Sequence, residues 1–480
     1  MTRVGSALAF SPEIVLVLAG AGVLCFDAIW PGRGRVERWV TLGAMALAAV
    51  CTLLVASHPE LYGVYFAGSL RVDATTTFAR VLFMVTGTLV VLSSWGGDGE
   101  GATAEYYGLL LLSLIGESVI VMSQSLIMLF VGIELLALPC YALMAIRKHL
   151  AGAVRAALKY FLLGMFASIV MLYGVALAYG ALHTISYVNG LFPDPASLGT
   201  ARAGLAMVAF LFLFVGIGFK ATAFPFHFWS PDVYAGGSAP IVAYVSTVPK
   251  VAIMLALVRV LGPGFSAAYP VGRTFILIIA VLSMVYGNVV ALLQDDVRRM
   301  LAYSGVANTG YMLIALAVGG AASTAALMFF LTVYAFGNLG AFLVVMALGE
   351  DRAVSMGDFS GLAGRNGLLA AAMAVCLFSL AGTPPLGGFF GKFALFKAAV
   401  DGGFAWLALI ALITTVVAIG YYLGIASRMY GSLVRPHEGE AEAAVGPVAV
   451  PRPLMAAIVT CMAAAVVLGV FGVTLLTAAR

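Results

Sequence analysis

Residues 216–225 read GIGFKATAFP, and residues 381–392 read AGTPPLGGFFGK. Both runs lie in long apolar stretches, and each sets a lysine, Lys220 or Lys392, beside glycine and proline. Proline removes a backbone donor and clashes with the preceding helical turn. At membrane depth, irregular backbone is tolerated only inside protein or along a wet cavity. Each run therefore predicts a broken transmembrane helix facing a polar interior, although a single such break taken alone is more often a packing kink.

The composition around these runs is that of a protein embedded in lipid. Of 480 residues, 63% are hydrophobic and only 10% are charged, with a mean hydropathy of +1.08. A soluble domain carries roughly a quarter charged residues. Fourteen spans of about 20 residues each would use about 280 residues, which is close to the number of apolar residues present. The loops are therefore short, and any large partner surface belongs to other chains.

Hydropathy predicts an all-α integral membrane protein of about fourteen transmembrane helices. The expected spans lie near 12–30, 38–56, 74–94, 106–122, 124–145, 157–181, 203–226, 239–261, 273–294, 300–318, 323–349, 366–400, 402–429 and 453–476. The two lysine-bearing breaks fall in the seventh and twelfth of these spans.

The distribution of basic residues supports this count, because cytoplasmic loops are enriched in Lys and Arg. Loops after odd-numbered spans hold thirteen: Arg33, Arg35, Arg38, Arg147, Lys148, Arg155, Arg298, Arg299, Arg352, Arg365, Arg428, Arg435 and Arg452. Loops after even-numbered spans and the two tails hold five: Arg3, Arg71, Arg202, Arg273 and Arg480. The bias predicts both termini on the outside of the membrane.

The two breaks are five spans apart, which predicts two equivalent five-helix units. An odd-numbered unit repeated in tandem is inverted in the membrane, as in many transporters. We expect a three-helix segment over 1–105, a first repeat over 106–261 (helices 4–8), a second repeat over 273–430 (helices 9–13), and a cytoplasmic loop with the last helix over 431–480.

Three lysines lie deep in apolar runs, namely Lys220, Lys250 and Lys392, and Lys397 follows the last of them on the same span. An ionisable group at the bilayer centre costs about 2.5–3.5 kcal/mol on insertion scales. Lysine releases its proton readily when buried, whereas arginine stays charged. The use of lysine therefore predicts proton exchange along these positions.

Glu134 lies in the middle of the fifth span, with Pro139 nearby. We interpret it as the counter-ion of one of the lysines, with Lys220 favoured. Pairing would keep the lysine charged, and separation would let it discharge. The alternative is a static ion pair that only holds helices together.

Further candidates for a proton relay are His227, after the seventh span, and Tyr303 and Asn308, in the tenth span. Each has an ordinary structural interpretation, since loop hydrogen bonding and helix packing use the same residue types.

No cofactor is expected on this chain. The five cysteines are single and form no C-x-x-C pair, which argues against iron-sulfur or zinc ligation. No phosphate-binding or dinucleotide motif is present, and the net charge of +4 is dispersed, so nucleic acid is not an expected partner.

Four motifs resemble the antiporter-like subunits shared by complex I, Mrp-type cation/proton antiporters and membrane-bound hydrogenases. They are FPFHFWSPDVYAG over 224–236, STVPKVA over 246–252, RRMLAYS over 298–304 and AGTPPLGGFFGKF over 381–393. Within that group, the PDVY run, the PKVA of the eighth helix and the lysine of the twelfth helix are similar to the subunit N family of bacterial NADH-quinone oxidoreductase.

This resemblance implies a proton-translocating membrane subunit, with Glu134 and Lys220 as the coupled pair, Lys250 as the link and Lys392 as the terminal donor. It implies a bacterial inner membrane location and partners among the subunits M, L, K, J, A and H. NADH, FMN, iron-sulfur clusters and quinone would be bound by other subunits. Asn308 departs from the family pattern, because many relatives have histidine there.

Two other functions compete with this one. The first is a subunit of an Mrp-type antiporter or membrane-bound hydrogenase. The second is a structural membrane spacer, in which neutral replacement of Lys250 would leave turnover intact.

Overall fold

The structure of the protein, a computed structural model, describes residues 3–30, 34–95, 103–188, 190–192, 198–262, 269–349, 353–431, 446–472 and 474. They are divided between two compact units. The first unit comprises Met1–Ala221 and Val248–Phe275, and the second comprises Thr222–Thr247 and Ile276–Arg480. Residues 432–445, which form most of the predicted cytoplasmic loop, lie outside the described residues.

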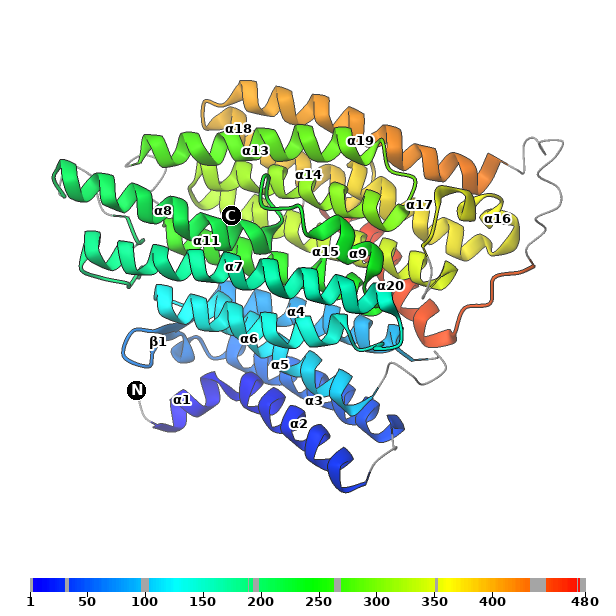
Figure 1. Cartoon of the computed structure of the whole chain (residues 1–480), viewed down its shortest axis with the longest axis horizontal. Helices are drawn as coiled ribbons and strands as arrows, with labels where there is room; N and C mark the ends of the chain where they lie inside the picture. The colour runs from blue at the N-terminus through cyan, green and yellow to red at the C-terminus, as the bar shows by residue number, and fades with distance from the viewer. Residues whose placement is uncertain are drawn as a thin grey trace. The chain divides into compact units, whose positions relative to one another are not determined.

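The first unit is a helical assembly with one small hairpin (Figure 1). Its elements are α1 (Arg3–Ala9), α2 (Ser11–Ile29), α3 (Gly34–Ser57), η1 (Pro59–Leu61), β1 (Gly63–Tyr65), β2 (Leu70–Val72), α4 (Ala74–Ser93), α5 (Ala104–Met122), α6 (Leu126–Met144), α7 (Ala151–Leu182), α8 (Thr200–Ala221) and α11 (Val248–Leu261). The strands β1 and β2 pair antiparallel in the loop between α3 and α4.

The second unit is built around α15. Its elements are α9 (Ser230–Gly236), α10 (Ala239–Val245), α13 (Pro270–Ala291, most of which lies in this unit), α14 (Val297–Val318), α15 (Ala321–Leu348), η3 (Met356–Phe359), α16 (Leu362–Arg365), α17 (Gly367–Ala381), α18 (Gly387–Asp401), α19 (Ala405–Gly431) and α20 (Arg452–Val470). Helix α15 packs against α10, α14, α17, α18 and α20.

Thirteen helical segments in the described part of the chain are long and apolar enough to cross a membrane, and one of them, Ala239–Leu261, consists of α10 followed by α11. The remaining predicted span, 366–400, consists of the two short helices α17 and α18, as its central break predicts. The chain is therefore a multi-pass, all-α membrane protein with the predicted set of spans. Whether 106–261 and 273–430 are inverted repeats stays a prediction.

Local sequence sets where several helices begin. Asp73 precedes α4 and its side chain accepts a hydrogen bond from the Thr76 backbone amide at 2.9 Å. Ser125 does the same for Met128 at the start of α6. These caps satisfy amide groups that have no partner within the helix. They also separate α5 from α6, because Ser125 lies in extended backbone between them.

Glycines let neighbouring helices of the first unit approach closely. A Cβ on Gly116 of α5 would lie 2.8 Å from the Leu136 Cα of α6, and one on Gly174 of α7 would lie 2.7 Å from the Leu213 nitrogen of α8. Small residues are favoured at such helix interfaces in membranes. The pairs α5/α6 and α7/α8 consequently form two closely packed hairpins, which run side by side in Figure 1.

Both predicted breaks interrupt helix geometry. Helix α8 ends at Ala221, five residues before the predicted end at 226, and Thr222 has a φ of 57°. The residue before a proline disfavours helical geometry, so Pro225 excludes a helix through Phe224. Helix α17 ends at Ala381, the following Gly382 has a φ of 87°, and the next helix begins at Gly387. Lys220 is thus in the last turn of α8, and Lys392 is in the second turn of α18.

Candidate functional site

The first unit brings together Glu134 of α6, Ser168 of α7 and Lys220 of α8. Lys220 is only 5% exposed. Its Nζ donates to the Tyr141 hydroxyl at 3.2 Å, and Tyr141 lies two turns after Glu134 on the same face of α6. Ser168 donates a hydrogen bond to the Glu134 carboxylate.

Aromatic rings surround the Lys220 ammonium. Its Nζ lies 5.0 Å from the ring centroids of both Tyr141 and Tyr160, and 5.7 Å from that of Phe219. The rings of Tyr141 and Tyr160 meet edge to face at 4.7 Å. A charged amine over aromatic faces is stabilised by the ring quadrupole. The immediate neighbours of Lys220 are therefore a hydroxyl and π faces.

The predicted partners Glu134 and Lys220 lie in one cluster without touching. The ion pairs found in the described chain do not include one between them. The Glu134 carboxylate still acts electrostatically on Lys220. Tyr141 stands in the hydrogen-bonding position because Gly164 of α7 leaves room for it: a Cβ on Gly164 would overlap the Tyr141 hydroxyl.

Lys250 lies near the start of α11 in the same unit and is 2% exposed. Helix α11 packs against α4, α5 and α8. The burial of Lys250 agrees with its position deep in an apolar run of the sequence.

Lys392 is the buried lysine of the second unit, at 3% exposure. Its Nζ donates to the Ala381 carbonyl at 3.0 Å, one of the carbonyl groups freed where α17 ends. It also lies 4.5 Å from the centroid of the Tyr311 ring on α14. A Cβ on Gly382 would come within 2.9 Å of the Lys392 Cδ, so the break leaves just enough space for the lysine stem.

A polar network extends from Tyr311 that the sequence analysis missed. The Tyr311 hydroxyl accepts from Asn288 Nδ2 at 3.1 Å and from Thr415 at 3.3 Å, and it donates to Thr414 at 3.2 Å. Asn288 Oδ1 in turn accepts from Tyr421 at 3.0 Å. The only signal in the sequence was the presence of polar residues in otherwise apolar spans.

Asn308, a predicted relay residue, joins a second branch. Its Nδ2 donates to the Ser304 carbonyl at 2.9 Å, and the Ser304 and Tyr422 hydroxyls are 2.5 Å apart. Asn308 Oδ1 is buried without a hydrogen-bond partner. A buried acceptor of this kind is costly, and a water molecule is its usual partner.

His227 and Tyr303, two further predicted relay residues, lie in one aromatic cluster of the second unit. The His227 ring centroid is 4.9 Å from that of Tyr286 and 6.1 Å from that of Tyr303, and it stacks on Phe224 at 5.6 Å. Burial lowers the pKa of His227 to about 4. His227 is therefore neutral near pH 7 in this arrangement.

Lys397, the remaining predicted relay residue, is not part of the buried clusters. It lies on the exposed face of α18 and forms an ion pair with Asp401 at 2.6 Å, one turn further along the helix. The helical period explains the difference, because positions five residues apart point in directions about 140° apart.

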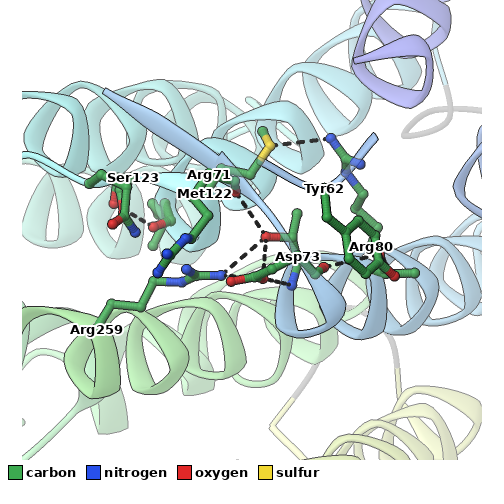
Figure 2. Close-up of polar contacts among 11 residues, drawn as sticks. Tyr62, Arg71, Asp73, Arg80, Met122, Ser123 and Arg259 are labelled. Atoms are coloured by element: carbon green, nitrogen blue, oxygen red, sulfur yellow. Dashed lines mark hydrogen bonds and ion pairs between the residues drawn. The ribbon is translucent and has the colours of Figure 1, made fainter. Parts of the chain in front are cut away.

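Two arginines that pair with carboxylates were also not predicted from the sequence. Arg80 of α4, 1% exposed, forms two hydrogen bonds of 2.8 and 2.7 Å with Glu13 of α2, and it donates to the Met122 sulfur at 3.2 Å. Arg259 of α11 pairs with Asp73 at 2.6 Å. Figure 2 shows the Arg259 side chain directed at Asp73 and that of Arg80 at Met122. Burial is the largest single effect on the pKa of Asp73, and it raises that pKa. The Arg259 charge and the hydrogen bonds to Asp73 together lower it by more, so the pKa of Asp73 lies below its usual range.

The described residues contain no group of three or more His, Cys, Asp or Glu side chains close enough to hold a metal ion. All five cysteines are free.

The chain is similar to known membrane proteins over most of its length. The family model described as "NADH:quinone oxidoreductase/Mrp antiporter, TM" matches residues 123–418. The chain is 38% identical to NADH-quinone oxidoreductase subunit N 1 of Solibacter usitatus, covering 92% of this chain and 90% of that one. It is 34% identical to subunit N of Desulfovibrio desulfuricans, covering 98% and 95%.

Solved structures give the same grouping. A chain of respiratory complex I from Thermus thermophilus matches with a TM-score of 0.82 at 31% identity, covering 97% of this chain and 98% of that one. A chain of the Mrp complex from Dietzia sp. matches with a TM-score of 0.84 at 23% identity, covering 100% and 96%, and this likeness concerns the fold alone. The chain therefore belongs to the NADH:quinone oxidoreductase/Mrp antiporter family of membrane proteins, in the group of relatives named subunit N of NADH-quinone oxidoreductase.

Proposed function

We propose that this chain is a proton-translocating membrane subunit of an NADH-quinone oxidoreductase, the respiratory complex I. The observation that carries the proposal is the burial of Lys220, Lys250 and Lys392, at 5%, 2% and 3% exposure, inside apolar helices. Each such lysine costs about 2.5–3.5 kcal/mol to place in a membrane. The relatives of the chain are named as subunits of NADH-quinone oxidoreductase. In a proton-translocating subunit, buried groups that hold and release protons would form the transfer path.

In this proposal, protons pass through Lys220 and Lys250 to Lys392 and then outward. Moving one proton against 100 mV costs about 2.3 kcal/mol. The energy would come from quinone reduction in other subunits, which would also bind NADH, FMN, iron-sulfur clusters and quinone. The chain itself would be a translocase subunit without redox chemistry.

Glu134 would act as a switch on Lys220. In the structure, Ser168 binds Glu134 and Tyr141 binds Lys220, which is the separated arrangement. A direct Glu134–Lys220 pair would hold the proton on the lysine, and its separation would favour release. His227, Tyr303 and Asn308 would extend the path towards the two membrane surfaces.

The assembly around the chain is part of the same proposal. The partners would be the antiporter-like subunits M and L and the small subunits K, J, A and H. The location would be the bacterial inner membrane, with both termini on the outside.

An Mrp-type antiporter subunit is the second candidate, because the matching family model covers both kinds of protein. The two differ in their driving force. A complex I subunit translocates protons only while NADH is oxidised, whereas an antiporter subunit exchanges protons for a cation without NADH.

Proton translocation into inverted membrane vesicles tests the proposal. Lys392→Met is compared with wild type under NADH, and assembly of the complex is measured in parallel. Lys148→Met, which replaces an exposed loop lysine, is the matched control. We expect Lys392→Met to abolish most pumping in an assembled complex while Lys148→Met pumps normally. Unchanged pumping in Lys392→Met would contradict the proposal.

A further inference from the structure

The Lys392 ammonium contacts a carbonyl group and the face of a tyrosine ring. Its Nζ is 3.0 Å from the Ala381 oxygen and 4.5 Å from the centroid of the Tyr311 ring. The ion pairs of the described residues give Lys392 no carboxylate partner. Within the described part of the second unit, the ring face is thus the side-chain group that, together with the Ala381 carbonyl, can stabilise the positive charge.

The Tyr311 ring is held firmly in this position. Its hydroxyl makes three hydrogen bonds, accepting from Asn288 and Thr415 and donating to Thr414. A phenolic hydroxyl has one donor and two acceptor positions, so its hydrogen-bonding capacity is filled. The side chain can swing away from Lys392 about the Cα–Cβ bond only by breaking buried hydrogen bonds, which is costly.

The interaction of such a ring with a cation is strong enough to change the proportion of charged Lys392. A cation over an aromatic face gains about 2 kcal/mol or more when both groups are desolvated. A difference of about 1.4 kcal/mol changes an equilibrium constant tenfold. The ring can therefore shift the balance between charged and neutral Lys392 by about tenfold or more.

The same arrangement occurs independently in the first unit. Lys220 lies 5.0 Å from the centroids of the Tyr141 and Tyr160 rings. Two lysines on different helices, each beside a helix end, are thus held against tyrosine faces.

We propose that Tyr311 is a positioning residue for Lys392. Its ring face stabilises the ammonium form of the lysine, and its hydroxyl network fixes the ring against Nζ. This inference rests on the proposed function, because it assigns a role in the proton transfer that Lys392 would carry out.

The test distinguishes the effect of the ring's electron density from the effect of its volume. Phenylalanine and phenylalanines with increasing numbers of ring fluorines are introduced at position 311 of the intact complex. Fluorine withdraws electron density from the ring face and changes its volume little. Proton translocation and NADH oxidation are measured in inverted vesicles, per assembled complex. Tyr311→Leu removes the ring altogether.

Phe330→Leu is the matched control. It removes another buried ring beside α18, because a Cβ on Gly391 would lie 2.9 Å from the Phe330 ring. The hydrogen bond and the cation–π contact of Lys392 involve Ala381 and Tyr311, not Phe330.

We expect Tyr311→Phe to pump more slowly than wild type, because its ring lacks the hydroxyl that holds it in place. The fluorinated series should lose further pumping stepwise relative to Phe, and Tyr311→Leu should pump about tenfold more slowly than wild type. Phe330→Leu should pump within about twofold of wild type. A flat fluorinated series, or a Tyr311→Leu complex that pumps at the wild-type rate, would overturn the inference. If Tyr311→Leu fails to assemble, the fluorinated series decides alone. The Lys392→Met variant distinguishes failure of this inference from failure of the proposed function. Normal pumping by Lys392→Met would contradict the proposed function as well. Loss of pumping by Lys392→Met together with a flat fluorinated series would contradict only the role of Tyr311.

Discussion

Gly164 determines where the Tyr141 hydroxyl lies, and through it the contact of Lys220. The space that this hydroxyl occupies is the space that a side chain at position 164 would need. Position 164 must be glycine for the tyrosine at position 141 to occupy this place. The packing of α6 against α7 is thereby connected to the proposed proton path.

Gly164→Ala should therefore displace Tyr141 from Lys220. A hydrogen bond to a charged group contributes about 1.5–3 kcal/mol, so we expect proton pumping to fall about tenfold. Gly180→Ala on the same helix is the control, because its Cβ would have only one neighbour, at 3.9 Å. Pumping by an assembled Gly164→Ala complex that equals that of Gly180→Ala would disprove the role of this contact.

His227 should make the stability of the protein depend on pH. Burial lowers the pKa of His227 to about 4, whereas a free histidine has a pKa near 6.5. Between these values the unfolded chain binds a proton at this position and the folded chain does not. The free energy of unfolding should thus fall as the pH falls from about 6.5 to 4, by about 1.4 kcal/mol per pH unit.

Thermal unfolding of the purified protein in detergent measures this effect. The melting temperature of wild type should decline more steeply below pH 6.5 than that of His227→Gln, which cannot bind the proton. Parallel declines of the two proteins would show that His227 is solvated in the folded state.

At the scale of elements, each break places a helix end at a buried lysine, the end of α8 at Lys220 and the end of α17 at Lys392. The end of α17 frees the Ala381 carbonyl that Lys392 binds. A Cβ on Gly388 would overlap the Ser379 carbonyl, so the first turn of α18 lies directly against the last turn of α17. The sequence predicted both breaks because proline and glycine act locally. It did not predict what would lie opposite them.

The buried pair of Arg80 and Glu13 connects α2 to α4. Removing one partner of a buried ion pair leaves an uncompensated charge, which costs about 3–5 kcal/mol. Glu13→Ala should lower the melting temperature strongly, whereas the double variant Glu13→Leu, Arg80→Met should recover most of the loss. Arg299→Ala breaks an exposed pair with Asp232 and should cost at most about 1 kcal/mol. Equal losses in Glu13→Ala and Arg299→Ala would contradict this view of the pair.

At the scale of the whole molecule, the proposed function requires that proton transfer and electron transfer depend on each other. Glu134→Gln and Lys220→Met should each lower proton pumping and NADH-driven quinone reduction together, in a complex that assembles normally. Wild-type rates of both activities would refute the path through these residues. A protein in which the charged groups only hold helices together would instead retain turnover when Lys250 is replaced by Met.

The sequence by itself determined the membrane spans, the two broken segments and the identity of the buried lysines. These features depend on local properties, since hydropathy, proline and glycine act within one or two helical turns. The resemblance of four motifs also led to the family that the comparisons show.

Only the tertiary structure decided which groups meet the lysines. Tyr141 is 79 residues from Lys220 in the chain, and Tyr311 lies on a different helix from Lys392. Such contacts depend on how each helix is rotated and how closely glycine lets it approach its neighbour. Hydropathy contains no information on that rotation. For this reason the sequence predicted Glu134 near Lys220 but not the Tyr141 and Tyr160 rings that contact the lysine, nor the hydrogen bond from Ser168 to Glu134.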